Sequence, residues 1–326
     1  MRTATPTLLP PIAFGRRDLQ HGLLLAVTMA GVVSMLSLAA TPGDRTARAT
    51  AFILLSLPPL LLALPAWSAA ARRWAAEPLW RWWYTLGLVV AVAPSPLVRQ
   101  TPGDVVRFAL YVFVVMLLDG ITPREGKPLW RHLFVVAAVW LPMEFNWVHG
   151  DFVLKRLLGI DLLLLLYSVE RPHFSLGRVL PSTRREWAWG LGTAAAFLAF
   201  AIPFAMATGF ASPGLARESA GRAVLQVVVV FWIIALPEEA LFRGVIQGLL
   251  SRSLRFGWAL GLAAVIFGVA HLDNGPHPDM RYLVLATVAG AAYGLAYRRT
   301  GTLAASTLTH FLVDFIWHGC FAGPRS

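Results

Sequence analysis

Long apolar blocks, separated by short loops that carry arginine, constrain the fold of this chain more than any other feature. A helix needs about twenty apolar residues to cross the hydrocarbon of a bilayer. Only 14% of the 326 residues are charged, whereas a soluble domain carries about 25%. We therefore expect an all-α fold, a polytopic transmembrane helix bundle in an integral, multi-pass membrane protein. About eleven spans are expected, near 20–40, 50–69, 83–98, 105–119, 132–145, 153–169, 187–208, 222–251, 256–271, 281–297 and 302–319.

The positive charge of the chain fits a membrane better than nucleic acid. The formal net charge is +11, but the arginines lie in the loops between apolar blocks and do not form one basic face. With the N-terminus inside, the inner loops would hold 17 of the 28 Lys and Arg residues and the outer loops 10. This excess agrees with the positive-inside rule. It places His271 toward the outer end of its span, and the lipid bilayer is the expected partner.

The most polar connection, at 169–186, divides the chain into two parts. We expect an N-terminal transmembrane helical region at 1–180 and a second helical unit at 181–326. The ionisable residues that suggest chemistry follow this connection. Cys320 is the single cysteine, so an intrachain disulfide and a cysteine-based zinc site are excluded.

The segment "PEEALFR" at 237–243 places three charges inside an apolar block. Burying a charge in a membrane without a partner costs several kcal/mol, so such residues are candidates for function. Glu239 and Arg243 are four residues apart, share one face of an α-helix and can pair. Glu238 lies about 100° around the axis and can point elsewhere. The alternative is a charged triad that only orients helices.

Two later blocks also carry polar residues. His271 ends "FGVAH" at 267–271, and "HFLVD" at 310–314 places His310 and Asp314 four residues apart on one face. Each could instead be structural, as a residue at the membrane interface or as a pair tying two helices together. Glu, His and Asp together suit activation of a water molecule at a carbonyl, with another polar group stabilising the oxyanion. A metal ion such as zinc, held by Glu238, His271 and His310, would serve the same end, and both options stay open.

The three motifs, in this order on successive C-terminal blocks, resemble the CPBP family of intramembrane proteases. This family includes CAAX prenyl proteases of the Rce1 type and the bacterial Abi proteins, and the resemblance covers roughly 187–319. It implies a protease in a bacterial cytoplasmic membrane, acting on a membrane-embedded or membrane-delivered polypeptide. It implies that Glu238 and His271 activate water, that His310 and Asp314 form the oxyanion site, and that Glu239 pairs with Arg243.

Asp314 departs from the prenyl-protease branch, which typically has Asn there. An ionised Asp cannot donate a hydrogen bond to an oxyanion. Asp314 would therefore be protonated, bind a metal, or hold His310 in orientation. Two other classes of function are compatible with the same residues. One is a non-catalytic binding or immunity protein of the same fold, and the other is a transporter, although no paired halves are evident.

Overall fold

The structure is a computed structural model, and it is mostly helical. It describes residues 83, 86–87, 89–90, 101–118, 129–145, 147–149, 178–214, 226–227, 229–272 and 278–322. The helices are α5 (Pro102–Leu117), α6 (Leu129–Glu144), α8 (Arg184–Ala207), η3 (Val230–Ala235), α10 (Leu236–Glu239), η4 (Ala240–Gln247), α11 (Gly248–Ser253), α12 (Phe256–Val269), α13 (Met280–Thr300) and α14 (Leu303–Cys320). Two short strands, β1 (Ser212–Pro213) and β2 (Phe321–Ala322), pair antiparallel.

The expected spans 105–119, 132–145, 187–208, 256–271, 281–297 and 302–319 correspond to helices whose ends differ from the predicted ones by a few residues. The span at 222–251 corresponds to a helical run given from Val230 to Ser253, and its expected start at 222–225 is outside the described residues. Of the span at 83–98, the few described residues are helical. The expected spans at 20–40, 50–69 and 153–169 lie outside the described residues. Within the described part of the chain, α8 is the one helix long and apolar enough to cross a membrane. Leu129–Met143 and α12 are apolar but shorter. The helical class is therefore confirmed, and the number of eleven spans is not.

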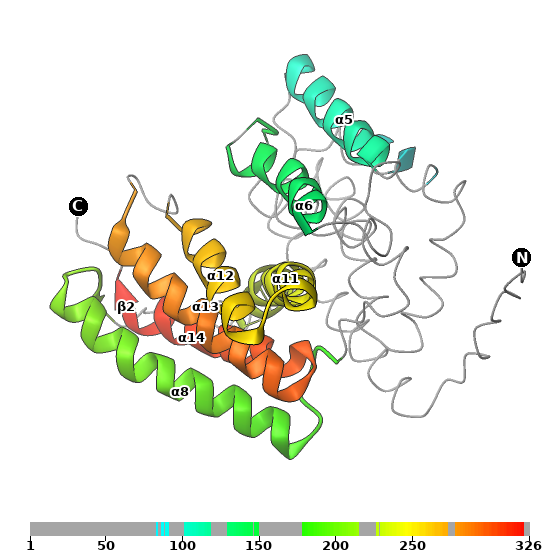
Figure 1. Ribbon diagram of the computed structural model, residues 1–326. Coiled ribbons are helices and arrows are strands. Elements are labelled where there is room, and N and C mark those ends of the chain that lie inside the picture. The colour runs from blue at the N-terminus through cyan, green and yellow to red at the C-terminus, as the bar shows by residue number, and fades with distance from the viewer. Residues whose placement is uncertain are drawn as a thin grey trace, which may run out of the picture.

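The C-terminal helices pack as one group. In Figure 1, α8, α13 and α14 run beside one another, and α12 lies against α13. Small residues allow close approach: a Cβ added to Gly290 of α13 would lie 3.0 Å from the Cα of Ala264 in α12. Thr193 of α8 and Thr309 of α14 hydrogen-bond through their hydroxyl groups at 2.7 Å. In a membrane the hydrophobic effect does not drive helices together, and helix interfaces there are rich in small and hydroxyl-bearing residues.

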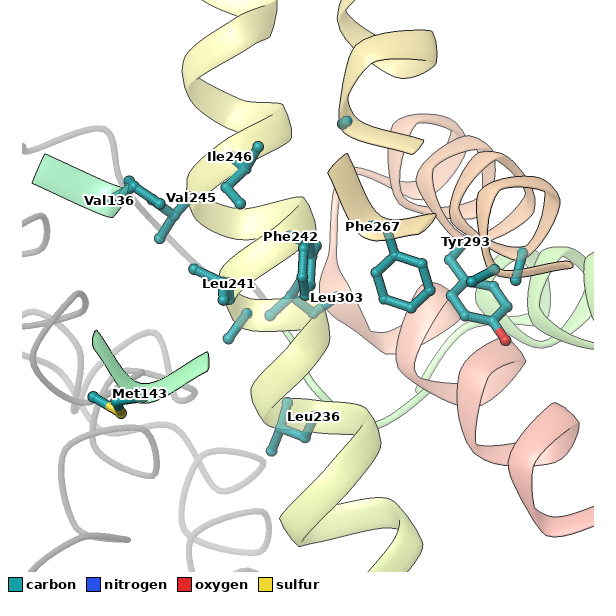
Figure 2. Packing of buried hydrophobic residues seen from close by; sticks show 14 of the residues in the cluster. Val136, Met143, Leu236, Leu241, Phe242, Val245, Ile246, Phe267, Tyr293 and Leu303 are labelled. Atoms are coloured by element: carbon teal, nitrogen blue, oxygen red, sulfur yellow. The ribbon is translucent and has the colours of Figure 1, made fainter. Parts of the chain in front are cut away.

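The continuous helical run at 230–253, made of η3, α10, η4 and α11, is called the central helix below. It is seen nearly end-on in Figure 1, between the C-terminal group and the pair α5 and α6. Every residue of η4 is buried, so this part of the helix is covered on all sides. Figure 2 shows Val136 of α6 on one side of it and Phe267 and Tyr293 on the other.

The central helix is not a regular α-helix, because η3 and η4 have π-helical hydrogen bonds. The N–H of Leu236 donates to the carbonyl of Phe231, five residues back. Pro237 follows at once, and it lacks an N–H while its ring crowds the carbonyl four residues before it. A wider turn before the proline relieves that crowding. Such turns in helices are frequent at functional sites.

Glu186 fixes the start of α8. Thr183 and Glu186 form a reciprocal capping box, each accepting the backbone N–H of the other. The Glu186 carboxylate, although buried, also accepts hydrogen bonds from Arg178 Nη2 at 2.8 Å and from the Thr302 hydroxyl at 2.8 Å. Because Thr302 precedes α14, this carboxylate joins the starts of α8 and α14 to the segment before α8.

Replacing Glu186 with alanine should destabilise the fold. The change removes a buried acceptor of charge-assisted hydrogen bonds and leaves donors unpaired, which costs about 2–3 kcal/mol. Chemical unfolding of the detergent-purified chain would measure this loss. The neighbouring Arg185 is exposed, so Arg185→Ala is the matched control and should change the free energy of unfolding by no more than about 0.5 kcal/mol. Equal losses for the two variants would contradict the anchoring role.

Candidate active site

The three motifs, distant in sequence, meet inside the C-terminal group of helices. Glu238 and Glu239 end α10, His271 follows the last turn of α12, and His310 and Asp314 lie in α14. Both glutamates and both histidines are buried, with 0–9% of each residue exposed. Asp314 is more open, since 23% of its side chain is exposed.

One carboxylate oxygen faces both imidazole rings. Glu238 Oε2 lies 3.6 Å from His271 Nε2 and 3.8 Å from His310 Nε2. These separations are longer than a direct N–H···O hydrogen bond, whose usual range is about 2.7–3.2 Å. A polar contact of this length is one in which a bridging water should be considered. The arrangement therefore provides a carboxylate and two imidazoles around a position that water can occupy.

Hydrogen bonds to the other ring nitrogen orient both histidines. His271 Nδ1 lies 2.8 Å from the carbonyl oxygen of Phe267, and His310 Nδ1 lies 2.9 Å from Glu239 Oε1. A carbonyl oxygen can only accept, and so can an ionised carboxylate, so each Nδ1 carries the proton. In the neutral ring the lone pair is then on Nε2, the atom that faces Glu238. A hydrogen bond to one ring nitrogen is the usual way in which proteins set the tautomer and the orientation of a functional histidine.

The pairing of Glu239 with Arg243 expected from their spacing is present. Arg243 Nη1 lies 3.0 Å from Glu239 Oε1, and both side chains are almost fully buried. Arg243 Nη2 also donates to the carbonyl of Gly290 in α13 at 3.0 Å. Its guanidinium lies over the rings of Phe267 and Tyr293, with its carbon 4.5 and 5.0 Å from the ring centres. The charge is therefore paired, hydrogen-bonded and stacked.

Asp314 lies beside His310. Its Oδ2 is 3.4 Å from His310 Nε2, one helical turn along α14. With Glu238 and Glu239, it is the third carboxylate within 4 Å of that ring. This position is compatible with holding His310, the third of the alternatives drawn from the sequence.

Sequence reasoning missed two buried side chains around the site. Tyr293 of α13 stacks on the His310 ring, with centroids 4.7 Å apart and planes 23° apart. Gln247 of η4 donates through Nε2 to the carbonyl of Gly294 at 3.1 Å, one turn beyond the bond from Arg243 to Gly290. Arg243 and Gln247 are four residues apart, and so are Gly290 and Gly294. This equal spacing was the signal in the sequence that could have indicated the second contact. Tyr293 carried none, because an aromatic residue in an apolar helix is ordinary.

Of the other polar residues of these segments, His318 is exposed near the end of α14, one helical turn beyond Asp314. Asp279 pairs with Arg281 at 2.7 Å at the start of α13. Asp273 and His277 fall outside the described residues.

The donor types around Glu238 are ones that zinc accepts, namely carboxylate oxygen and imidazole nitrogen. Among the described residues, however, no three His, Cys, Asp or Glu side chains are arranged to hold one metal ion. No step proposed below passes through a metal ion.

Comparison with protein families gives one match, to the model described as Rce1-like, type II CAAX prenyl endopeptidase Rce1-like. No curated protein and no solved structure matches the chain significantly. The family match spans residues 220–316, under a third of the chain, and includes all three motifs and the central helix. Residues 220–316 are therefore an Rce1-like segment, and the resemblance to the CPBP family of intramembrane proteases is confirmed.

Proposed function

We propose that this protein is an intramembrane endopeptidase that hydrolyses a peptide bond of a membrane-embedded or membrane-delivered polypeptide. The observation that carries the proposal is Glu238 Oε2, buried and within 4 Å of the Nε2 atoms of His271 and His310. The Rce1-like match over 220–316 supports the same reaction class. Many large apolar side chains are exposed on the described helices, Trp258 at 75% among them, and this supports an integral membrane protein.

In the proposed reaction, Glu238 is the general base and His271 assists it. Glu238 takes a proton from water as the water oxygen bonds to the carbonyl carbon of the substrate. The carbonyl π bond becomes the lone pair of an oxyanion. When the tetrahedral intermediate collapses, the C–N bond breaks, and the proton held by Glu238 passes to the leaving nitrogen. General acid–base catalysis of this kind contributes about 10²–10⁴-fold to a rate.

His310 is the proposed oxyanion donor. In its doubly protonated form the ring donates from Nε2 to the oxyanion while Nδ1 remains bonded to Glu239. Glu239 is neutralised by Arg243, so we assign this pair to holding the imidazole and not to proton transfer. Tyr293 stacks on the ring and limits its rotation.

Asp314 is proposed to position His310 and not to contact the oxyanion. Asp314→Asn keeps a hydrogen-bond acceptor near His310 Nε2, so cleavage should fall by no more than about tenfold. Asp314→Ala removes the acceptor, and the loss should approach that of a catalytic donor, about 10²-fold. In the pH–rate profile, the limb at high pH reports loss of the proton that His310 donates from Nε2. Removal of a carboxylate that positions His310 should shift this limb. Equal activity of the alanine variant and the wild type would contradict the assignment.

The proposed activity is tested with the full chain in proteoliposomes and a library of transmembrane peptides, with product masses measured. The wild type should cleave, and His271→Ala should cleave at least about 10²-fold more slowly. Cleavage unaffected by a chelator supports water activation by Glu238, while chelator-sensitive cleavage overturns it in favour of a metal. Peptides that bind but stay intact would overturn the protease assignment in favour of a binding protein.

A further inference from the structure

Six exposed arginines gather at one end of the C-terminal helices. Two begin α8, two flank the turn between α11 and α12, and two lie in the last turn of α13. We call this set the arginine end. Its members are Arg184, Arg185, Arg252, Arg255, Arg298 and Arg299, all exposed.

Contacts between the helices show that these arginines share an end. The hydrogen bond from Thr302 to Glu186 brings the start of α14 to the start of α8. The guanidinium of Arg298 lies 5.4 Å from the ring centre of Phe256, which brings the end of α13 to the start of α12. Because α14 rises away from here through 18 residues, its last residue, Cys320, lies about 27 Å farther along the bundle.

The arginine end has no exposed acid to balance it among the described residues nearby. Glu186 is the acidic residue there, and it is buried and bonded to Arg178. At the opposite end the described helices carry Arg281, whose charge is offset by Asp279 at 2.7 Å. Positive charge is therefore concentrated at one end of the described bundle.

Aromatic side chains lie among these charges. Arg299 sits over the ring of Trp189, 5.2 Å from its centre. Trp187 and Trp258, in the first turns of α8 and α12, are 47% and 75% exposed. Tryptophan with arginine at the ends of apolar helices is typical of the headgroup region of a membrane. A nucleic-acid surface would not continue directly into exposed apolar helix faces, as α12 does through Leu262, Val265 and Val269.

We propose that the arginine end binds the phosphate groups of anionic phospholipids in the cytoplasmic leaflet. Basic residues at a membrane surface are attracted to anionic lipid, and the positive-inside rule assigns such an end to the cytoplasm. The end that carries Cys320 then faces the opposite side of the membrane. The inference rests on the proposed membrane location, but it does not depend on catalysis.

The single cysteine makes the orientation testable. Cys320 is exposed at the end of α14, and Ser253 is exposed between Arg252 and Arg255. Intact bacterial cells that produce the full chain are treated with a membrane-impermeant maleimide. Cys320 should be labelled in intact cells. A Cys320→Ser/Ser253→Cys variant should be labelled at least tenfold more after permeabilisation. The reverse pattern would overturn the orientation, whether or not the protein cleaves peptides.

Lipid binding is measured separately by native mass spectrometry of the detergent-purified chain with phosphatidylglycerol or phosphatidylcholine. The wild type should bind phosphatidylglycerol at least tenfold more tightly. A variant with Gln at Arg184, Arg185, Arg298 and Arg299 should lose that preference, and the matched variant with Lys should keep most of it. No preference in the wild type would overturn lipid binding. Binding of duplex DNA that competes with the lipid would overturn it in favour of nucleic acid.

Discussion

Cleavage by the Glu238→Gln variant should be about 10²–10⁴-fold slower than by the wild type, while the protein stays folded. The amide has nearly the shape of the carboxylate, but it cannot take a proton from water. Its interaction with His271 and His310 also loses the negative charge. The measurement is the initial rate of peptide cleavage in proteoliposomes, together with the melting temperature of the same preparation.

Ser251→Ala is the control for this change. Ser251 lies on the central helix, as Glu238 does, but it is exposed in α11, several turns farther on. Its replacement should leave the rate within about twofold, as expected for a surface change away from the site. Full activity of Glu238→Gln would show that another group is the base. A loss of folding in this variant would assign Glu238 a structural role instead.

The Arg243→Met variant should lose about 3–5 kcal/mol of folding free energy, because it leaves Glu239 buried without its countercharge. It also removes the hydrogen bond to Gly290 that joins the central helix to α13. The loss is measured by chemical unfolding in detergent and should appear as poor accumulation in cells.

The double variant Glu239→Gln/Arg243→Met separates charge from packing. With both charges removed, no uncompensated carboxylate remains, and most of the lost stability should return. The side-chain amide that replaces the Glu239 carboxylate still has a carbonyl oxygen, which can accept the hydrogen bond from His310 Nδ1. If the double variant were no more stable than Arg243→Met, the missing packing and Gly290 contact would be the cause, and not the buried charge.

The helices could be predicted from the sequence because the length of each apolar block and the positions of the loops between blocks determine where helices begin and end. Thus 281–297 and 302–319 correspond closely to α13 and α14. The interior of the central helix could not be predicted in the same way. An apolar run gives no sign of whether a turn is α or π. The step of about 100° per residue holds between Glu238 and Glu239, which lie in α10, but not through η3 and η4 on either side. Pro237 was the visible indication of irregularity.

The candidate site was predictable where charge stands out against an apolar background. Glu239, Arg243, His310 and the residues near them were found because an ionisable side chain at this depth needs a partner. Tyr293 and Gly290 were not found, since their roles depend on a stacked ring and a backbone carbonyl that appear only in three dimensions.

A single atom, Glu239 Oε1, forms the ion pair with Arg243 Nη1 at 3.0 Å and accepts the hydrogen bond from His310 Nδ1 at 2.9 Å. The stability of the fold and the orientation of the His310 ring therefore depend on the same oxygen atom. Substitutions at Arg243 and His310 should therefore give effects that do not add in a double-mutant cycle. A chain that keeps a well-aligned imidazole has, by the same contact, kept its central helix joined to α14, and Arg243 extends the connection to α13 through Gly290.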